Sequence, residues 1–211
     1  MIKFEQTEVW GIKHAIRGMR NPMNSWERSD TVFDGNKMCL GENDKDLMTR
    51  LIRSGVPHRK FLRQIFVSVD ITAPLYWWKE FDTYKVGTTA NGCSTMHKIQ
   101  VKKFTLDDFS HEHLMPDVIE YMEYLCNVLN ACRNYYLKTQ DKKWWWQMIQ
   151  ILPSSYNQKR TVTMTYENLL NILEYRRGHK LDEWCTFCDW ILTLPDSSLL
   201  EEGIKGGYAN V

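Results

Sequence analysis

The 211-residue sequence has no long apolar run and no excess of charge of either sign. No segment approaches the roughly 20 consecutive apolar residues that span a bilayer, and residues 1–8 lack the apolar core of a signal peptide. The formal net charge of +1 provides no general attraction for DNA or RNA. These absences predict a cytoplasmic protein that binds neither a membrane nor a nucleic-acid polymer, although a single nucleotide would need only a local cationic pocket.

The sequence also lacks a complete set of metal ligands. Cys185 and Cys188 form a C-x-x-C pattern, but no second pair and no nearby histidine pair completes a zinc set. His111 and His113 are separated by one residue and have no apparent third ligand. We therefore predict no metal site, buried reduced thiols at the C-x-x-C and a solvated loop at the two histidines.

Neither glycine motif that binds phosphates is present, yet residues 71–99 are unusual. They indicate the end of a strand, a turn at Pro74, an aromatic helix and a polar loop over 87–95. Four aromatic residues recur at roughly helical spacing, namely Trp77, Trp78, Phe81 and Tyr84. The loop has two glycines and several hydroxyls, so its backbone could approach a ligand closely. A buried core helix and an ordinary turn explain the same residues, so the pattern indicates a candidate pocket and no reaction.

Alternating helices and short strands are expected along the rest of the chain. Hydrophobic residues make up 43% and aromatic residues 13%, enough for one domain over residues 1–211 with a loose tail at 200–211. The expected helices cover 9–19, 43–55, 116–139, 144–152, 168–177 and 181–194. A short strand is expected before the 9–19 helix, further strands at 64–72 and 160–166, and a short extended piece at 98–106. We expect the 116–139 helix to contact the core or a partner subunit, and at least one of Trp144–Trp146 to cover a partner or a ligand.

Two stretches together resemble the flavin-dependent thymidylate synthases, the family called ThyX. The first is the strand ending in Ile71-Thr-Ala-Pro-Leu, followed by the helix and loop that reach Met96. The second is Leu152-Pro153, a strand, and residues 168–176 followed by His179 and Glu183. The resemblance covers roughly three-quarters of the chain. It implies an α+β fold in which a small antiparallel sheet is flanked by helices with a long helical segment, and a homotetramer with active sites where subunits meet.

The sequence departs from the family's signature, which contains Arg-His-Arg. Thr83-Tyr84-Lys85 stands at this position, so only Lys85 keeps a positive charge. Cys93 and Thr95 replace a serine and an arginine, and Glu80 replaces a glutamine. The match improves nearer the C-terminus, where Arg160 or its neighbour Lys159 falls at the family's nucleotide arginine. Arg176, His179 and Glu183 also match.

The resemblance, if it extends to activity, implies a flavoprotein methyltransferase of nucleotide biosynthesis. Such an enzyme uses FAD, NADPH and methylene-tetrahydrofolate to convert dUMP to dTMP. The nucleotide contacts would be Glu80, Lys85, Asn91, Cys93, Ser94 and Arg160. The cofactor contacts would be Thr83, Tyr84, Lys85, Arg176, His179 and Glu183. Arg176 and Cys93 are the catalytic candidates, although no basic neighbour that activates Cys93 is established.

Two other functions fit the same pattern. The chain could be a non-catalytic ThyX-fold protein with a binding or regulatory role, since a flavin would need a different phosphate cradle. It could also be an enzyme with altered nucleotide or cofactor specificity. The nucleotide assignment requires that Lys85, Arg160 and Arg176 converge on one anion-holding hollow.

Overall fold

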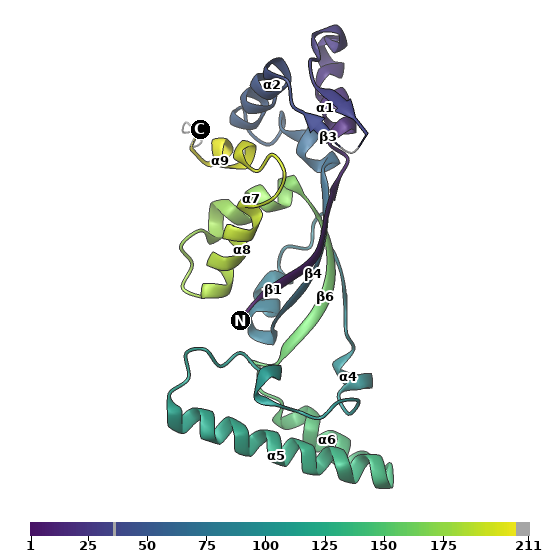
Figure 1. The fold of residues 1–211 in the computed structure, drawn as a ribbon, viewed down its shortest axis with the longest axis vertical. Helices are drawn as coiled ribbons and strands as arrows, with labels where there is room; N and C mark the ends of the chain where they lie inside the picture. Colours follow the sequence, from purple (N-terminus) through teal and green to yellow (C-terminus); the bar gives the residue numbers. More distant parts are fainter. Residues whose placement is uncertain (36, 206–211) are drawn as a thin grey trace. The chain divides into compact units, whose positions relative to one another are not determined.

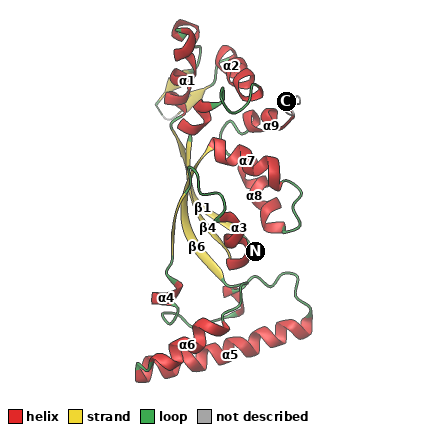
Figure 2. Ribbon diagram, turned by 180° about the vertical axis from the view of Figure 1, so that it is seen from behind, coloured by secondary structure: helices red, strands yellow, loops and turns green. Residues whose placement is uncertain are grey.

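Within residues 1–35 and 37–205, which the computed structural model describes, the chain forms an α+β fold with a four-stranded antiparallel sheet and a two-stranded sheet (Figures 1 and 2). The strand order is β1-β4-β6-β5 in the larger sheet and β2-β3 in the smaller. The strands are β1 (Lys3–Trp10), β2 (Val32–Asp34), β3 (Lys37–Cys39), β4 (Phe66–Pro74), β5 (Thr89–Gly92) and β6 (Asn157–Thr165). The α+β prediction is confirmed.

The described residues also form helices. The α-helices are α1 (Ile12–Arg20), α2 (Glu42–Arg53), α3 (Leu75–Phe81), α4 (Thr95–Lys98), α5 (Pro116–Thr139), α6 (Lys142–Ile151), α7 (Tyr166–Arg176), α8 (Asp182–Leu192) and α9 (Ser198–Lys205). Short 3-10 turns are η1 (Asn21–Met23), η2 (Trp26–Arg28), η3 (Lys60–Gln64) and η4 (Leu106–Asp108). Residues 200–205 of the expected loose tail are therefore helical, and residues 206–211 lie outside the described residues.

The chain divides into two compact units, and β1, β4 and β6 each contribute residues to both. The first unit contains residues 1–5, 70–83 and 90–161. The second contains residues 6–69, 84–89 and 162 onward. The single domain over residues 1–211 stays a prediction.

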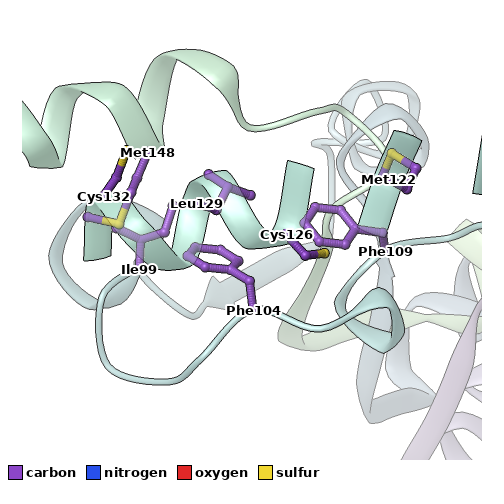
Figure 3. Packing of buried hydrophobic residues seen from close by; sticks show 8 residues of the cluster. All are labelled: Ile99, Phe104, Phe109, Met122, Cys126, Leu129, Cys132 and Met148. Carbon is purple, nitrogen blue, oxygen red and sulfur yellow. The ribbon is translucent and has the colours of Figure 1, made fainter. Parts of the chain in front are cut away.

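A hydrophobic cluster of the first unit lies between α5, α6 and the segment before them (Figure 3). Pro116 stands at the first turn of α5, where its missing N–H costs nothing. Met122, Cys126, Leu129 and Cys132 then recur on one face of the helix and are buried. Burial of an aliphatic side chain of this kind stabilises the fold by about 1.5–3 kcal/mol.

The opposite face of α5 carries exposed aromatic side chains. Tyr121 is 62% exposed and Tyr124 65% exposed. On the neighbouring helix α6, Trp146 is exposed, whereas Trp144 and Trp145 are half-buried. Contact of these residues with a partner subunit or a ligand stays a prediction.

The second unit is held by α7, which packs against α8, α9 and η3. Thr165 begins α7 with a capping box, in which its hydroxyl accepts from the Asn168 N–H and Asn168 Oδ1 accepts from the Thr165 N–H. Two buried ion pairs lie within this unit. Arg20 Nε is 2.7 Å from Asp44 Oδ1, and Arg59 Nε is 3.0 Å from a Glu167 carboxylate oxygen.

Strand β4 confirms the strand predicted over 64–72, and its side chains alternate between a buried and a partly exposed face. Val67, Val69 and Ile71 are fully buried, while Ser68 and Asp70 on the other face are partly exposed. The prediction of an extended piece at 98–106 was wrong. Side chains from α5 bind the backbone of this segment: Asn130 pairs with the N–H and the carbonyl of Phe104, at 2.9 and 2.8 Å. These groups are therefore not used in a strand.

Three other boundaries differ from the predictions. The polar loop over 87–95 contains β5, because this segment pairs with β6. Helix α3 ends at Phe81, so Tyr84 lies beyond it. Helix α2 covers Glu42–Arg53 rather than 43–55. The Asp30 carboxylate accepts from the backbone N–H groups of Asn43 and Asp44, at 2.9 and 3.1 Å, and so caps the helix from a distant part of the sequence.

Candidate functional site

A cavity of about 380 Å³ lies in the first unit, beside the polar loop that the sequence singled out. Cys93, Ser94 and Lys98 line one part of it, and Tyr156 and Lys159 line another. The loop is held against β6 by backbone and side-chain contacts. The Cys93 N–H donates to the Lys159 carbonyl at 3.0 Å, and Gln158 Nε2 donates to the Cys93 carbonyl at 2.7 Å.

The cavity lining carries charges of both signs. Lys98, Lys102 and Lys159 supply positive charge, whereas Asp107 and Asp108 supply negative charge. Lys102 forms an ion pair with Asp108, and this contact raises the pKa of Lys102. An anion bound here would therefore meet lysines, two of which already have carboxylate partners.

Lys159 is one of those two paired lysines. Its Nζ lies 3.0 Å from a Glu5 oxygen and 3.2 Å from an Asp70 oxygen. The hydrogen bond to Glu5, and then that to Asp70, raises the pKa of Lys159. The hydroxyl of Thr161 donates to Asp70 Oδ1 at 2.6 Å. These residues come from β1, β4 and β6, so the sheet positions this charge cluster at the cavity.

Tyr156 adds an aromatic ring to the lining. The ring meets that of Phe109 edge to face, with 5.8 Å between the centroids. Burial, and then the negative charge of Asp108, raises the pKa of the Tyr156 phenol. The side chain is therefore a neutral hydroxyl over the physiological pH range.

Arg160 is fixed within the same unit by three contacts. Its guanidinium lies over the ring of Trp78, 4.2 Å from the centroid. Arg160 Nε donates to Gln158 Oε1 at 2.9 Å, and Nη1 lies 2.7 Å from Asp82 Oδ1. A side chain at Gly92 would come within 3.0 Å of Arg160 Cγ, so the glycine leaves room for this arrangement.

Lys159 and Arg160 alternate along β6, and Lys159 is the one that lines the cavity. The sequence alone did not decide which of the two residues corresponds to the family's nucleotide-binding arginine. Side chains of neighbouring strand residues point to opposite faces, so Lys159 contacts Asp70 whereas Arg160 contacts Trp78.

A second cluster surrounds Arg176 in the second unit. Arg176 Nε donates to the Tyr84 hydroxyl at 2.9 Å, and Nη1 lies 3.0 Å from His179 Nε2. The guanidinium lies over the buried Trp184, 4.5 Å from the ring centroid. The Leu181 N–H donates to His179 Nδ1 at 3.1 Å. The structure therefore brings together Tyr84, Arg176 and His179, which the sequence assigned to cofactor binding.

Lys85 is exposed on the segment that follows Tyr84. Asn168 of α7 holds this segment, because its Nδ2 donates to the Val86 carbonyl at 2.6 Å. Gly87 has a positive φ of 75°, and a Cβ there would lie 3.0 Å from Asn168 Oδ1. The position of Lys85 therefore depends on α7.

The other predicted site residues are divided between the units. Glu80 lies in α3, and the Thr83 hydroxyl donates to its carbonyl at 2.7 Å. Asn91 is exposed in β5. Glu183 is buried in the first turn of α8. Arg160 belongs to the first unit and Lys85 and Arg176 to the second, so their convergence on one hollow stays a prediction.

Sequence reasoning missed several residues of these sites. Lys98, Lys102 and Tyr156 line the cavity, and Trp78 and Trp184 lie against Arg160 and Arg176. The clustering of lysines from residue 98 to 103 was a signal for the first group. For Trp184, the sequence signal was its position in an amphipathic helix. That position predicts a core residue but does not predict a contact with an arginine.

The described part of the chain has neither a metal-binding cluster nor a membrane-spanning helix. None of its groups of three or more His, Cys, Asp or Glu side chains could hold a metal ion. Nor does any helix there have the length and apolarity to cross a bilayer.

The fold is that of the flavin-dependent thymidylate synthases. Two similar solved structures are both ThyX from Helicobacter pylori with FAD and dUMP. One matches with a TM-score of 0.70 and 17% identity, covering 97% of this chain and 100% of that one. The other matches with a TM-score of 0.68 and 18% identity, covering 95% and 100%. No family model and no curated protein matches the sequence.

Proposed function

We propose that the protein binds a pyrimidine nucleotide together with FAD and methylates dUMP to dTMP, or performs a related one-carbon transfer. The observation that carries this proposal is the fold, which nearly the whole chain shares with structures that hold FAD and dUMP. The proposal includes NADPH and methylene-tetrahydrofolate as co-substrates and a homotetramer as the assembly.

The cavity in the first unit supports nucleotide binding. Its volume of about 380 Å³ falls within the range of about 300–1,000 Å³ that is usual for small-molecule sites. Lysine side chains would hold the phosphate. Ser94 and Asn91 would donate hydrogen bonds to the ribose or base, or accept hydrogen bonds from them. Glu80, Lys85, Cys93 and Arg160 complete the proposed nucleotide contacts.

The residues around Arg176 fit an anionic group attached to an aromatic ring system. The guanidinium is already oriented by Tyr84 and His179 and is supported by the ring of Trp184. An oriented guanidinium loses little entropy when it binds a phosphate. Thr83, Lys85 and Glu183 are the other proposed cofactor contacts. Bound FAD would supply hydride transfer and carry the one-carbon unit, while this chain would position the ligands and hold their charges.

An absorption spectrum and a turnover assay test the proposal. We expect the purified protein to show flavin absorbance in the near ultraviolet and blue, or to gain thermal stability with FAD and with dUMP. We expect dTMP to form from dUMP when FAD, NADPH and methylene-tetrahydrofolate are present, as measured by mass spectrometry. No flavin absorbance together with no thermal shift by either ligand would refute the proposal.

A non-catalytic role or an altered specificity is the second candidate. It is favoured by Thr83-Tyr84-Lys85, which carries one cation where the family signature has Arg-His-Arg, and by the carboxylate already bound to Arg160. Expression in a thymidine-requiring bacterium separates the candidates. Restored growth without thymidine excludes the non-catalytic role, and binding without turnover excludes methylation of dUMP.

A further inference from the structure

A second cavity, of about 230 Å³, lies in the second unit and has no part in the proposed reaction. One face of α1 forms its floor, with Lys13, Ile16 and Arg17, and its walls include Trp26 and Phe33. The opposite face of α1, which contains the buried Ala15, packs toward η3. The helix therefore has one face in the core and one face at a cavity.

The walls of this cavity are aromatic. Trp26 is 50% exposed, and its Nε1 donates to Asn21 Oδ1 at 2.8 Å, which holds the indole in place. Lys13 Nζ lies 5.5 Å from the centroid of the Phe33 ring. An apolar cavity of about 150 Å³ is large enough to hold benzene. The cavity is therefore large enough for an aromatic ring with a polar substituent.

The charge on the cavity lining is of one sign. Lys13, His14, Arg17 and Arg20 are basic, and among the described residues that line the cavity none is acidic. The nearby Asp44 is buried, and its two oxygens already accept from Arg20 Nε at 2.7 Å and from Ser29 Oγ at 2.8 Å, among other donors. Arg17 and Lys13 are both exposed, and the contact of Lys13 with the Phe33 ring leaves its ammonium accessible to an anion.

A buried hydrogen-bond donor of Arg20 is the feature that indicates a ligand. The residue is 3% exposed and lines the cavity. Its Nε binds Asp44 and its Nη1 donates to the Ser25 carbonyl at 3.3 Å. Its Nη2 is buried and has no hydrogen-bond partner among the described residues. A buried donor without a partner is costly. Because Nη2 has almost no accessible surface, a ligand acceptor would reach it once the guanidinium turned toward the cavity, and the new hydrogen bond would remove that cost.

We infer that this cavity binds a small aromatic acid, with its ring between Trp26 and Phe33 and its anionic group toward Arg17 and Arg20. The aromatic walls select a planar ring, since stacked and edge-on rings attract one another. The excess of basic side chains selects an anionic over a neutral ligand. Neither argument depends on whether the chain binds FAD or dUMP.

Calorimetric titration of the full chain with 2-naphthoate and with neutral 2-naphthamide tests the inference. The two probes share the ring system and differ in charge. We expect 2-naphthoate to bind at least about tenfold more tightly, because a charge-assisted hydrogen bond is worth about 1.5–3 kcal/mol and 1.4 kcal/mol is a factor of ten. Equal affinity for the two probes, or no saturable binding of either, would overturn the inference.

Two variants locate the binding. Arg17→Gln and Trp26→Ala change exposed side chains, so both should fold, as circular dichroism will check. We expect each to raise the Kd of 2-naphthoate by roughly five- to tenfold. Lys45→Gln removes an exposed cation of α2 that does not line the cavity and should leave the Kd unchanged. Unchanged binding in the first two variants, or an equal loss in Lys45→Gln, would place the ligand elsewhere.

A second measurement does not rely on variants that weaken binding. Ile16 is buried at the cavity floor, and its methyl signal can be assigned with Ile16→Val in an isoleucine-labelled sample. We expect 2-naphthoate to shift this signal, because an aromatic ring within the cavity changes the local magnetic field. A signal that stays fixed while 2-naphthoate binds contradicts the assignment.

Discussion

Arg160 and Asp82 form an ion pair in which the two side chains differ in their exposure to solvent. Their Nη1 and Oδ1 atoms are 2.7 Å apart, and the side chain of Arg160 is 17% exposed whereas that of Asp82 is 51% exposed. Trp78 and Gln158 also hold the guanidinium. Asp82 follows the last residue of α3 and is the more exposed partner. If Arg160 contacts a nucleotide phosphate, as proposed, the Asp82 carboxylate would compete with that phosphate for the guanidinium.

Asp82→Asn should strengthen the binding of dUMP if Arg160 holds the phosphate. The change removes a carboxylate that competes for the guanidinium and keeps the size of the side chain. A partly exposed ion pair is worth about 0.2–1 kcal/mol, so we expect the Kd to fall by roughly two- to fivefold. Calorimetric titration measures the Kd. Glu120→Gln, an exposed change on α5 in the same unit, is the control, and an Asp82→Asn that binds dUMP no better contradicts the role of Arg160.

Arg176→Lys should weaken FAD binding although the charge is kept. Lysine cannot stack on Trp184 as a planar group, and it lacks the planar fork of donors by which Arg176 contacts Tyr84 and His179. We expect the Kd for FAD to rise by about tenfold or more, as measured by the quenching of flavin fluorescence. The adjacent Arg177→Lys provides a matched control, because Arg177 is exposed and pairs only loosely with Glu201 at 3.8 Å. An equal effect in both variants would count against a specific role of Arg176.

Asp44→Asn should destabilise the fold severely. Asp44 is fully buried, and the change would leave the Arg20 guanidinium buried without its counter-charge. We expect a loss of about 3–5 kcal/mol in the free energy of unfolding, measured in urea. Asp46→Asn on the same helix breaks an exposed pair with Arg50 and should cost no more than about 0.5 kcal/mol. A loss of similar size in both variants would show that burial of the pair is unimportant.

The same carboxyl makes stability depend on pH. Burial alone would raise the pKa of Asp44, but hydrogen bonds from Thr31, Ser29 and Arg20 outweigh it and hold the pKa below its ordinary value of 3.8. A lowered folded pKa stabilises the native state above the unfolded pKa, and this contribution is lost as the pH falls through the folded value. The wild-type and Asp44→Asn free energies of unfolding should therefore approach each other below about pH 3.8. A difference that stays constant there would contradict this linkage.

Thiol labelling should separate exposed from buried cysteines. Cys39 and Cys93 are exposed, whereas Cys126, Cys132 and Cys188 are buried. Burial raises the pKa of Cys188 to about 11, so this thiol is neutral and protected at neutral pH. We expect an aromatic disulfide reagent to label Cys93 and Cys39 first. Because Cys93 lines the cavity, saturating dUMP should slow its labelling and leave that of Cys39 unchanged, and equal rates with and without dUMP would contradict nucleotide binding there.

Asn168 offers a test of the segment that carries Lys85. Asn168→Asp keeps the oxygens that accept from Thr165 but loses the amide that donates to the Val86 carbonyl. Asn168→Ala loses both. We expect faster hydrogen exchange near residues 84–87 in both variants. An additional loss of about 1 kcal/mol in the free energy of unfolding is expected only for alanine. Unchanged exchange in Asn168→Asp would show that the amide does not hold the segment.

Helix α5 and strand β4 could be predicted because their signals are local. A proline at the first turn and a stripe of apolar residues mark α5 from Pro116 to Thr139. Apolar residues at every second position mark β4, and these residues are the buried ones in the structure. The start of α2 could not be predicted in the same way, since its cap is the side chain of Asp30, thirteen residues before Asn43. The segment over 98–106 has an extended composition, but Asn130 binds its backbone from α5.

The residues of the candidate site also fall into two groups, those that the sequence indicated and those that required the structure. The residue types of the polar loop and the resemblance at 168–183 pointed to Cys93, Ser94, Arg176 and His179. Only the structure showed that Lys159 rather than Arg160 lines the cavity, and that Trp78 and Trp184 support the two arginines. The direction of a strand residue depends on register, and an aromatic ring beneath a guanidinium comes from another segment of the chain.

By itself, the sequence determined the kinds of elements and the polar loop, because helical and strand periods follow from the geometry of neighbouring residues. The tertiary structure decided which charges are neutralised, which side chain enters a cavity, and where a buried arginine keeps an unused donor. Each of these depends on contacts between segments far apart in the chain, and short-range pattern carries no information about which segments meet.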